Sequence, residues 1–210
     1  MLHWLLTLLV ALPPIVDMPS SQANMPLVIG LHGRGDTPEN FSQAARRLGT
    51  DLHWLFLRGP LPWKADLQGT QWFDRQTSDG GKAALDAAIA LVDGQVRKAG
   101  KKPVGLVGFS QGCMVAAHYT ATYPDRVRAV LCFGGMLIAP VRVPAGKHAV
   151  QLRFIHGRND PMVPIAKARE AVQILRDAGL QIVLTEHEGG HSMPPQLLPE
   201  LRLWLLAQLR

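Results

Sequence analysis

The clearest chemical signal in the sequence is a serine in the glycine-flanked pentapeptide Gly108–Gly112, Gly-Phe-Ser-Gln-Gly. The pentapeptide lies between the apolar run Val104–Phe109, which has the composition of a buried strand, and a helical pattern that starts at Gln111. In this position it predicts a nucleophile elbow, a sharp strand-to-helix turn in which glycines allow close backbone approach and Ser110 projects at a helix N-terminus. The motif alone fits equally well a glycine-rich turn with a serine N-cap.

A serine hydroxyl needs an imidazole base, and the imidazole needs a carboxylate that fixes its tautomer. Asp160 follows the strand-like segment Leu152–Ile155, and His191 follows two glycines beyond the last apolar run. The chain order Ser, Asp, His is the one expected for an α/β-hydrolase sheet, with all three residues in loops at the carboxyl ends of strands. Ser110, Asp160 and His191 are therefore the predicted nucleophile, orienting carboxylate and base. Other titratable residues are less well placed, at strand ends, within a helix or in a turn: His118, His156, His187 and Asp125.

Acyl transfer also needs two N–H donors for the oxyanion of the tetrahedral intermediate. One is the backbone N–H of the residue after the nucleophile, here Gln111. The second is expected from the loop after the first strand, where Leu31–Asp36 (Leu-His-Gly-Arg-Gly-Asp) supplies a glycine-rich turn. A flexible turn is the alternative interpretation of this loop.

From Met25 onward, short apolar runs alternate with longer segments of helical period. This alternation predicts an α/β fold, an α/β-hydrolase sheet that is mostly parallel and flanked by helices on both faces. The predicted strands are apolar on both faces, as buried parallel strands are: Leu27–Leu31, His53–Leu57, Val104–Phe109, Val127–Phe133, Leu152–Ile155 and Gln181–Glu186. The predicted helices are Phe41–Leu48, Lys82–Lys98, Gln111–Thr122, Ile165–Ala178 and Pro195–Leu209. Residues 59–81 fit neither period and are predicted to form a functional loop over one end of the sheet.

Length and composition indicate one globular domain. The chain has 210 residues, of which 47% are apolar and 18% charged, so it can bury a core and has too little charge to be disordered. No apolar run reaches the roughly 20 residues of a membrane-spanning helix. The net charge of +6 is spread over small basic groups, and aromatic residues make up only 6% of the chain. These features argue against a nucleic-acid partner and favour a small-molecule substrate.

The two cysteines, Cys113 and Cys132, lie among apolar neighbours without a CxxC spacing or a histidine cluster. Neither a zinc site nor a disulfide is indicated, and buried free thiols are the expected state. The predicted chemistry requires no metal and no organic cofactor.

Residues 1–24 form an apolar extension ahead of a catalytic domain predicted over residues 25–210. The run from Trp4 to Leu12 and the small residues around Ala23 resemble a signal peptide, but no Lys or Arg precedes the run. A helix docked on its own domain, on a second subunit or at a membrane surface is the other interpretation, and Met25 is an alternative start. We expect a cytoplasmic monomer or homodimer, with export as the alternative.

Five ordered motifs resemble the phospholipase/carboxylesterase family of α/β-hydrolases, which includes bacterial carboxylesterases, lysophospholipases and acyl-protein thioesterases. The motifs cover nearly the whole chain from about Met25: Leu31–Asp36, Trp72–Asp74, Gly108–Gly112, Asp160–Pro164 and Gly190–His191. The resemblance implies that the backbone amides of Arg34 and Gln111 form the oxyanion hole. It also assigns four apolar residues to the acyl site, where a role in the hydrophobic core is the alternative: Trp72, Phe73, Met136 and Leu137.

Three features depart from the family pattern. Arg34 stands where the family commonly has a leucine, and its guanidinium would favour an anionic or polar substrate. Cys113 stands where a further glycine is common, and it is expected to pack in the first helical turn rather than act as a nucleophile. The strands usual before the His-Gly loop are not evident in residues 1–24, so this edge of the sheet is expected to be shortened or replaced.

Together these residues predict a serine carboxylic-ester hydrolase that acts on short- to medium-chain acyl esters through an acyl-enzyme intermediate. An acyl thioesterase or lysophospholipase would use the same catalytic residues and is the nearest alternative. A non-catalytic binding protein on the same fold is the alternative from another class, because a fold does not by itself fix a function.

Overall fold

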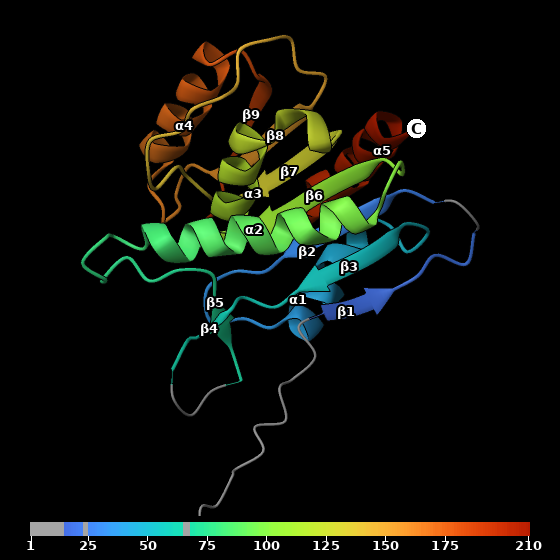
Figure 1. Ribbon diagram of the computed structural model, residues 1–210, viewed down its shortest axis with the longest axis horizontal. Coiled ribbons are helices and arrows are strands. Elements are labelled where there is room, and N and C mark those ends of the chain that lie inside the picture. The colour runs from blue at the N-terminus through green and yellow to red at the C-terminus, as the bar shows by residue number, and fades with distance from the viewer. Residues whose placement is uncertain (1–14, 23–24, 65–67) are drawn as a thin grey trace, which may run out of the picture.

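The computed structural model describes residues 15–22, 25–64 and 68–210 (Figure 1). The apolar run Trp4–Leu12 and the residue Ala23 of the expected cleavage site lie outside these ranges. Seven strands form one sheet in the order β1-β3-β2-β6-β7-β8-β9, and all neighbours in it pair in parallel except β1, which is antiparallel to β3. The strands are β1 (Ile15–Met18), β2 (Leu27–Leu31), β3 (His53–Leu57), β6 (Val104–Phe109), β7 (Ala129–Phe133), β8 (Gln151–Gly157) and β9 (Gln181–His187).

Helices cover both faces of this sheet (Figure 1). On one face α2, α3 and α4 enclose a core that includes Leu85 and Leu106, and on the other face α1 and α5 enclose a core that includes Phe41 and Val107. Leu106 and Val107 are consecutive residues of β6 and face opposite cores, which explains why the central strands are apolar throughout. The helices are α1 (Pro38–Ala45), α2 (Lys82–Lys98), α3 (Gln111–Thr122), α4 (Ile165–Asp177) and α5 (Leu198–Leu209), with short 3-10 turns at Arg46–Leu48, Pro124–Arg126 and Pro195–Leu197.

The predicted α/β architecture is confirmed, and most elements begin and end within two residues of their predicted bounds. Local signals explain several of these ends. Thr37 caps α1 by accepting a hydrogen bond from the backbone N–H of Asn40 at 3.1 Å. Gly179 follows α4 with a φ of 93°, a left-handed conformation that ends a helix and favours glycine. None of the described helices is long and apolar enough to cross a membrane.

The edge of the sheet extends further toward the N-terminus than the sequence indicated. Residues 15–18 form β1, which pairs with β3 from Ile15 opposite Leu57 to Met18 opposite Trp54. A strand that was not evident in the sequence of residues 1–24 therefore forms this edge of the sheet. Part of the predicted extension 1–24 thus belongs to the sheet.

Residues 59–81 contain a small element that the sequence did not predict. Strands β4 (Leu61–Pro62) and β5 (Thr70–Gln71) form a two-stranded antiparallel pair. Thr70 joins it to the loop after β2, because its backbone N–H donates to Asp36 O at 3.0 Å and its carbonyl accepts from Gly35 N–H at 2.8 Å. The segment is therefore attached at the carboxyl end of the sheet, as expected for a loop over that end.

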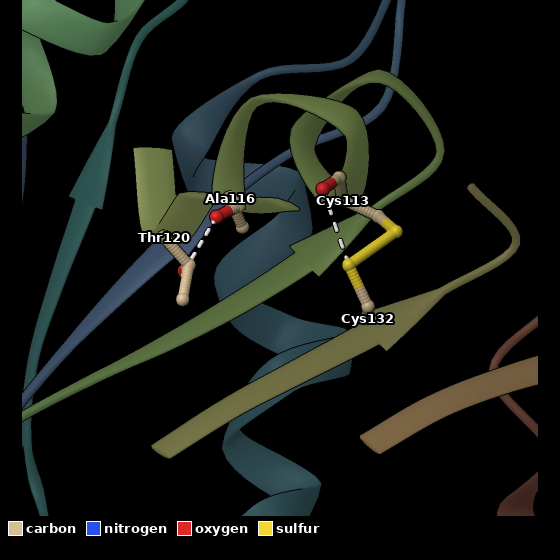
Figure 2. Close-up of a disulfide and its surroundings, with 4 residues drawn as sticks. All are labelled: Cys113, Ala116, Thr120 and Cys132. Atoms are coloured by element: carbon tan, nitrogen blue, oxygen red, sulfur yellow. Dashed lines mark hydrogen bonds between the residues drawn. A yellow bond between two sulfur atoms is a disulfide. The ribbon is translucent and has the colours of Figure 1, made fainter. Parts of the chain in front are cut away.

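Cys113 and Cys132 form a disulfide, so the prediction of free thiols is wrong (Figure 2). Their Cα atoms are 4.7 Å apart, a separation that a disulfide can span. The bond joins the first turn of α3 to β7, and both cysteines are fully buried. The sequence did not reveal the pairing because it depends on the position of β7 beside β6 in the sheet.

Candidate active site

Ser110 occupies the turn between β6 and α3 and has a φ of 53° and a ψ of −117°. Among the described residues it is the only one other than glycine with a positive φ, a conformation that is strained when a side chain is present. A Cβ atom added at Gly108 would lie 2.5 Å from the backbone of Cys113, and one added at Gly112 would overlap Leu31 O. The turn therefore has the geometry of a nucleophile elbow and depends on both glycines.

A hydrogen bond of 2.6 Å joins Asp160 Oδ2 to His191 Nδ1. Asp160 follows β8 and His191 follows β9, and these strands are neighbours in the sheet. Because an ionised carboxylate can only accept, Nδ1 carries the hydrogen and Nε2 of the neutral ring keeps its lone pair. The pair holds the tautomer that a general base requires.

The carboxylate of Asp160 is held in its charged form. Its Oδ1 accepts hydrogen bonds from the backbone N–H groups of Met162 at 2.8 Å and Val163 at 2.9 Å. Burial by itself raises the pKa of Asp160, but the hydrogen bonds from Val163, His191 and Met162 outweigh it and hold the pKa below its usual value. The ionised Asp160 can therefore orient His191 and stabilise its protonated form.

A second histidine, His156 in β8, fastens the loop that carries Asp160. His156 is 1% exposed, and its Nε2 donates to Val163 O at 2.8 Å and lies 3.4 Å from Asp160 Oδ2. Its Nδ1 has no hydrogen-bond partner within the described part of the chain. The backbone N–H of Val163 thus donates to Asp160, and the carbonyl of Val163 accepts from His156. The sequence placed His156 at the end of a strand and did not indicate these contacts.

The other titratable residues considered in the sequence have separate contacts. His118 accepts a hydrogen bond from the Ile138 N–H at 3.1 Å, and burial lowers the pKa of His118 to about 4. His187 Nδ1 accepts from a backbone N–H two residues later, and Asp125 lies 3.0 Å from His148 Nδ1. Within the described ranges, no group of three or more His, Cys, Asp or Glu side chains is arranged to hold a metal ion.

Ser110 and His191 line the same surface pocket, which has a volume of about 320 Å³. The His191 ring lies 4.9 Å from the ring of Phe109, centroid to centroid. On the other side, a Cβ atom added at Gly134 (φ 61°) would lie 3.0 Å from the His191 ring, so the loop after β7 closely confines the imidazole. The structure thus brings the three residues of the predicted triad together at the carboxyl ends of β6, β8 and β9.

The loop that carries Arg34 is fastened by the fully buried His32. His32 Nδ1 lies 2.6 Å from Gly33 O, and Nε2 accepts a hydrogen bond from the Gly59 N–H at 3.0 Å. These partners select the neutral tautomer with the hydrogen on Nδ1. Burial lowers the pKa of His32, which preserves both hydrogen bonds at neutral pH. His32 belongs to the Leu31–Asp36 motif, but the sequence does not indicate this role.

The side chain of Gln111 fastens the segment that contains Trp72 and Phe73. Gln111 Oε1 accepts from the Trp72 N–H at 3.0 Å, and Nε2 donates to Phe73 O at 2.9 Å. The indole N–H of Trp72 donates to His32 O at 2.8 Å. Gln111 was predicted for its backbone amide alone, and these side-chain contacts add a link between the elbow and residues 59–81.

A small cavity of about 110 Å³ lies beside Ser110, and both Arg34 and Gln111 contribute to its lining. Two of the four apolar residues assigned to the acyl site, Phe73 and Met136, also line it. The other two do not: Trp72 is fully buried in the core, and Leu137 lines a separate groove against α4. The remaining lining residues are Arg75, Met114, Met162 and Val163.

Comparison with known proteins identifies the family and the fold. The sequence profile of the phospholipase/carboxylesterase family matches residues 15–207. The chain is 27% identical over 191 residues to esterase YpfH of Escherichia coli (strain K12), covering 85% of this chain and 81% of that protein. It is 25% identical over 193 residues to acyl-protein thioesterase 1 of Schizosaccharomyces pombe, covering 82% and 86%. Its structure resembles acyl-protein thioesterase 2 of Zea mays with a TM-score of 0.79 at 21% identity, covering 93% and 99%.

The family match begins at β1 and ends within α5. It therefore includes all seven strands of the sheet and every loop that contributes to the site. The fold is the α/β-hydrolase fold, and the relatives named as esterases identify the chain as an ester-hydrolysing enzyme. The chain belongs to the phospholipase/carboxylesterase family.

Proposed function

We propose that the chain is a serine carboxylic-ester hydrolase that acts on short- to medium-chain acyl esters through Ser110, His191 and Asp160. The observation that carries the proposal is the hydrogen bond from His191 to a buried, ionised Asp160, beside a serine held in a strained elbow. A histidine in this tautomer activates a serine hydroxyl. Residues 25–210, extended at the edge by β1, would form the catalytic domain.

In the first half of the reaction, Ser110 Oγ attacks the acyl carbonyl carbon while His191 Nε2 takes the hydroxyl proton. Asp160 stabilises the imidazolium that forms and holds its orientation. His191 then gives the proton to the leaving alkoxide, so an alcohol departs and an acyl-serine ester remains. In the second half, His191 activates water in the same way, and the attack of water on the acyl-serine releases the acid and restores the serine hydroxyl.

The negative charge of each tetrahedral intermediate would be stabilised by the backbone N–H groups of Arg34 and Gln111. Both residues line the cavity beside Ser110, and their loops are held by His32 and by the Gln111 side chain. Donors that are fixed before the reaction need no reorganisation when the charge develops, and each contributes about 3 kcal/mol of barrier lowering in comparable enzymes. Preorganisation of these loops therefore supports the assignment.

The preference for short to medium acyl chains is supported by the cavity. Its volume is about 110 Å³, well below the roughly 300–1,000 Å³ of pockets that enclose drug-sized ligands. Phe73, Met136 and Val163 give it apolar walls. We infer that a short acyl chain fits within it and that a long chain must extend onto the surface.

The test is hydrolysis of p-nitrophenyl esters across a series of acyl lengths. We expect turnover that peaks at short or medium chains and that falls by at least about 10³-fold in Ser110→Ala and His191→Ala. Ser21→Ala, an exposed serine near the N-terminal edge, is the matched control and keeps wild-type turnover. Turnover that survives in Ser110→Ala would overturn the triad assignment. Turnover that increases steadily with acyl length would overturn the chain-length assignment.

Thioester hydrolysis is the second candidate, favoured by the similarity to acyl-protein thioesterase 1 of Schizosaccharomyces pombe. Competition between an oxygen ester and a thioester with the same acyl chain decides which is preferred. A fluorophosphonate probe addresses the non-catalytic alternative, because it should label wild type and fail on Ser110→Ala. A folded protein that refuses the probe and hydrolyses no ester would favour a binding function.

The disulfide bears on the cellular location. Disulfides form and persist mainly in oxidising compartments, so the Cys113–Cys132 bond favours the exported alternative over the cytoplasmic location expected from the N-terminal sequence. Thiol counting under denaturing conditions, on protein from its native cells, decides between them: no free thiol supports export, and two free thiols support the cytoplasm. Size-exclusion chromatography of the same protein tests the expectation of a monomer or homodimer.

A further inference from the structure

Two arginines, Arg34 and Arg75, line the small cavity beside Ser110. They come from different loops, Arg34 from the turn after β2 and Arg75 from the segment before α2. Both side chains are exposed, whereas Phe73 and Val163 of the same cavity are buried. The cavity therefore has an apolar interior and a cationic rim.

Most arginines elsewhere in the described chain are neutralised by carboxylates. Examples are Arg58 with Glu39 at 2.8 Å, Arg153 with Glu200 at 2.6 Å and Arg202 with Asp51 at 3.0 Å. Neither rim arginine forms an ion pair with a carboxylate of residues 15–22, 25–64 or 68–210. Within the described part of the chain, no carboxylate competes with a ligand for the rim charges.

The acidic residues closest to them in the sequence have other contacts. Asp36 Oδ1 accepts from the Thr37 N–H at 2.8 Å and from Asn40 Nδ2 at 2.7 Å, at the start of α1. Asp74 Oδ1 accepts from the Gln76 N–H at 2.9 Å. These carboxylates stabilise local turns, and Asp160 is engaged by His191.

Trp63 supports the cationic rim. The Arg34 guanidinium carbon lies 4.6 Å from the centroid of the Trp63 ring, and Lys64 Nζ lies 5.5 Å from the same ring. Stacking on an aromatic ring restricts an arginine while leaving its N–H donors free to bind an anion. A restricted guanidinium loses less conformational entropy when it binds.

We propose that this enzyme prefers acyl groups that end in an anionic group, and that Arg34 and Arg75 bind that group at the rim of the acyl cavity. The proposal rests on the proposed esterase function. The apolar interior would hold the methylene groups of a short chain, and the two guanidiniums would hold a terminal carboxylate, as in a monoester of a dicarboxylic acid. Planar guanidiniums with several donors match the two oxygens of a carboxylate. The assignment to the acyl side follows from Arg75, which lines this cavity together with Met136.

The test compares two p-nitrophenyl esters that differ only in charge. One carries an adipoyl group, and the other carries the same chain with an isopropyl group in place of the terminal carboxylate. We expect the ratio of kcat/KM, anionic over neutral, to be about tenfold or more in wild type, in line with a charge-assisted hydrogen bond. The ratio should fall about tenfold in Arg75→Gln and in Arg34→Gln, and it should decrease as salt is added because salt screens exposed charges.

Arg47→Gln is the matched control, because Arg47 is an exposed arginine in the 3-10 turn after α1 and does not line the cavity. It should leave the ratio at the wild-type value. A wild-type ratio of one or less, or a ratio that Arg75→Gln and Arg34→Gln leave unchanged, would overturn the proposal. A general loss of activity in Arg34→Gln would lower kcat/KM for both esters equally. The ratio of the two kcat/KM values therefore reports charge recognition alone.

A further pair of substrates places the charge on the other side of the ester. These share one neutral acyl group and differ in whether the nitrophenol carries a carboxylate. Selectivity confined to this pair would overturn the acyl-side assignment. Ser110-dependent hydrolysis of the neutral esters without charge selectivity would overturn the preference for anionic acyl groups and leave the proposed esterase function intact. Absence of both hydrolysis and fluorophosphonate labelling would overturn the preference and the esterase function together.

Discussion

The two halves of the candidate site are each fastened by a buried histidine, but in different ways. The acid–base half comprises Asp160, His191 and their loops, and the oxyanion half comprises the Leu31–Asp36 loop with residues 59–81. In the oxyanion half both ring nitrogens of His32 have partners. In the acid–base half His156 uses only Nε2, and its Nδ1 has no partner within the described ranges.

This difference shows which charges each half needs. The oxyanion half depends on a neutral histidine that accepts a hydrogen bond from Gly59 and whose pKa burial lowers. The acid–base half depends on an ionised carboxylate, Asp160, whose hydrogen bonds outweigh the effect of burial and lower its pKa. Substitutions in the acid–base half should therefore act mainly on the chemical step, and those in the oxyanion half on chemistry and stability together.

The largest effect is expected from Asp160→Asn. The amide preserves the shape of the side chain but no longer fixes the His191 tautomer, so we expect kcat to fall by about 10⁴-fold, as for the equivalent change in a serine protease. The folded structure should persist, as judged by circular dichroism and thermal unfolding. Asp177→Asn, at the exposed C-terminal end of α4, is the control and should retain full activity. A loss below tenfold would remove Asp160 from the triad.

A smaller effect on activity, accompanied by a loss of stability, is expected from His32→Ala. The change leaves the Gly59 N–H without its acceptor and releases the loop that carries Arg34. We expect kcat to fall about 100-fold, the order seen when one oxyanion donor is lost, and the free energy of unfolding to fall by about 2–3 kcal/mol. His32→Gln can both donate and accept, so it should recover part of each loss. Wild-type activity in His32→Ala would show that the loop holds its geometry without this histidine.

His156→Ala should have a smaller effect on activity again. His156 is a positioning residue, since it contacts the carboxylate of Asp160 and the carbonyl of Val163 but is not assigned to the reacting atoms. We expect kcat to fall about tenfold to 100-fold with little change in KM, because a displaced carboxylate misaligns His191. His156→Gln retains a donor and should recover activity better than His156→Leu, which has a similar size. Equal activity in the two variants would indicate that His156 only fills space.

The sequence predicted those features of the site that depend on local order along the chain. Ser110, Asp160 and His191 could be proposed as a triad because each follows a recognisable strand, and such residues meet at one edge of a parallel sheet. The roles of His32, His156 and the Gln111 side chain were missed because they depend on partners in other loops, such as Gly59, which no spacing reveals.

The same reason explains the errors in the fold. The strand β1, Ile15–Met18, is short, and only its pairing with β3 marks it as a strand. The disulfide depends on the distance between α3 and β7, not on the spacing between Cys113 and Cys132. The central strands, by contrast, carry their own apolar pattern, and their bounds could be predicted closely.

The disulfide joins α3 to β7 and belongs to neither half, so its loss should act mainly on stability. The free energy of unfolding of the Cys113→Ala/Cys132→Ala variant should be about 3 kcal/mol lower than that of wild type. The disulfide joins residues with a sequence separation of 19, and a bond that closes a loop of this size stabilises a protein by restricting its unfolded chain. At 25 °C the folded variant should keep kcat within a few-fold of wild type. Urea unfolding with and without reductant measures the effect, and the variant itself should not respond to reductant. A large loss of kcat in the folded variant would mean that the bond positions Ser110 directly.

The smallest effect is expected from mild acid, and it should arise in the oxyanion half. The pKa of His32 is lowered in the folded state, so below about pH 6.5 the unfolded chain binds a proton that the folded chain does not, and the free energy of unfolding falls as pH falls. The lowered pKa of Asp160 has its effect only below about pH 4, where the unfolded carboxyl group takes up a proton first. Urea unfolding of wild type and His32→Gln at pH 7 and pH 5 isolates the histidine. Wild type should lose more free energy of unfolding than the variant between these values, and equal losses would show that folding does not lower the pKa of His32.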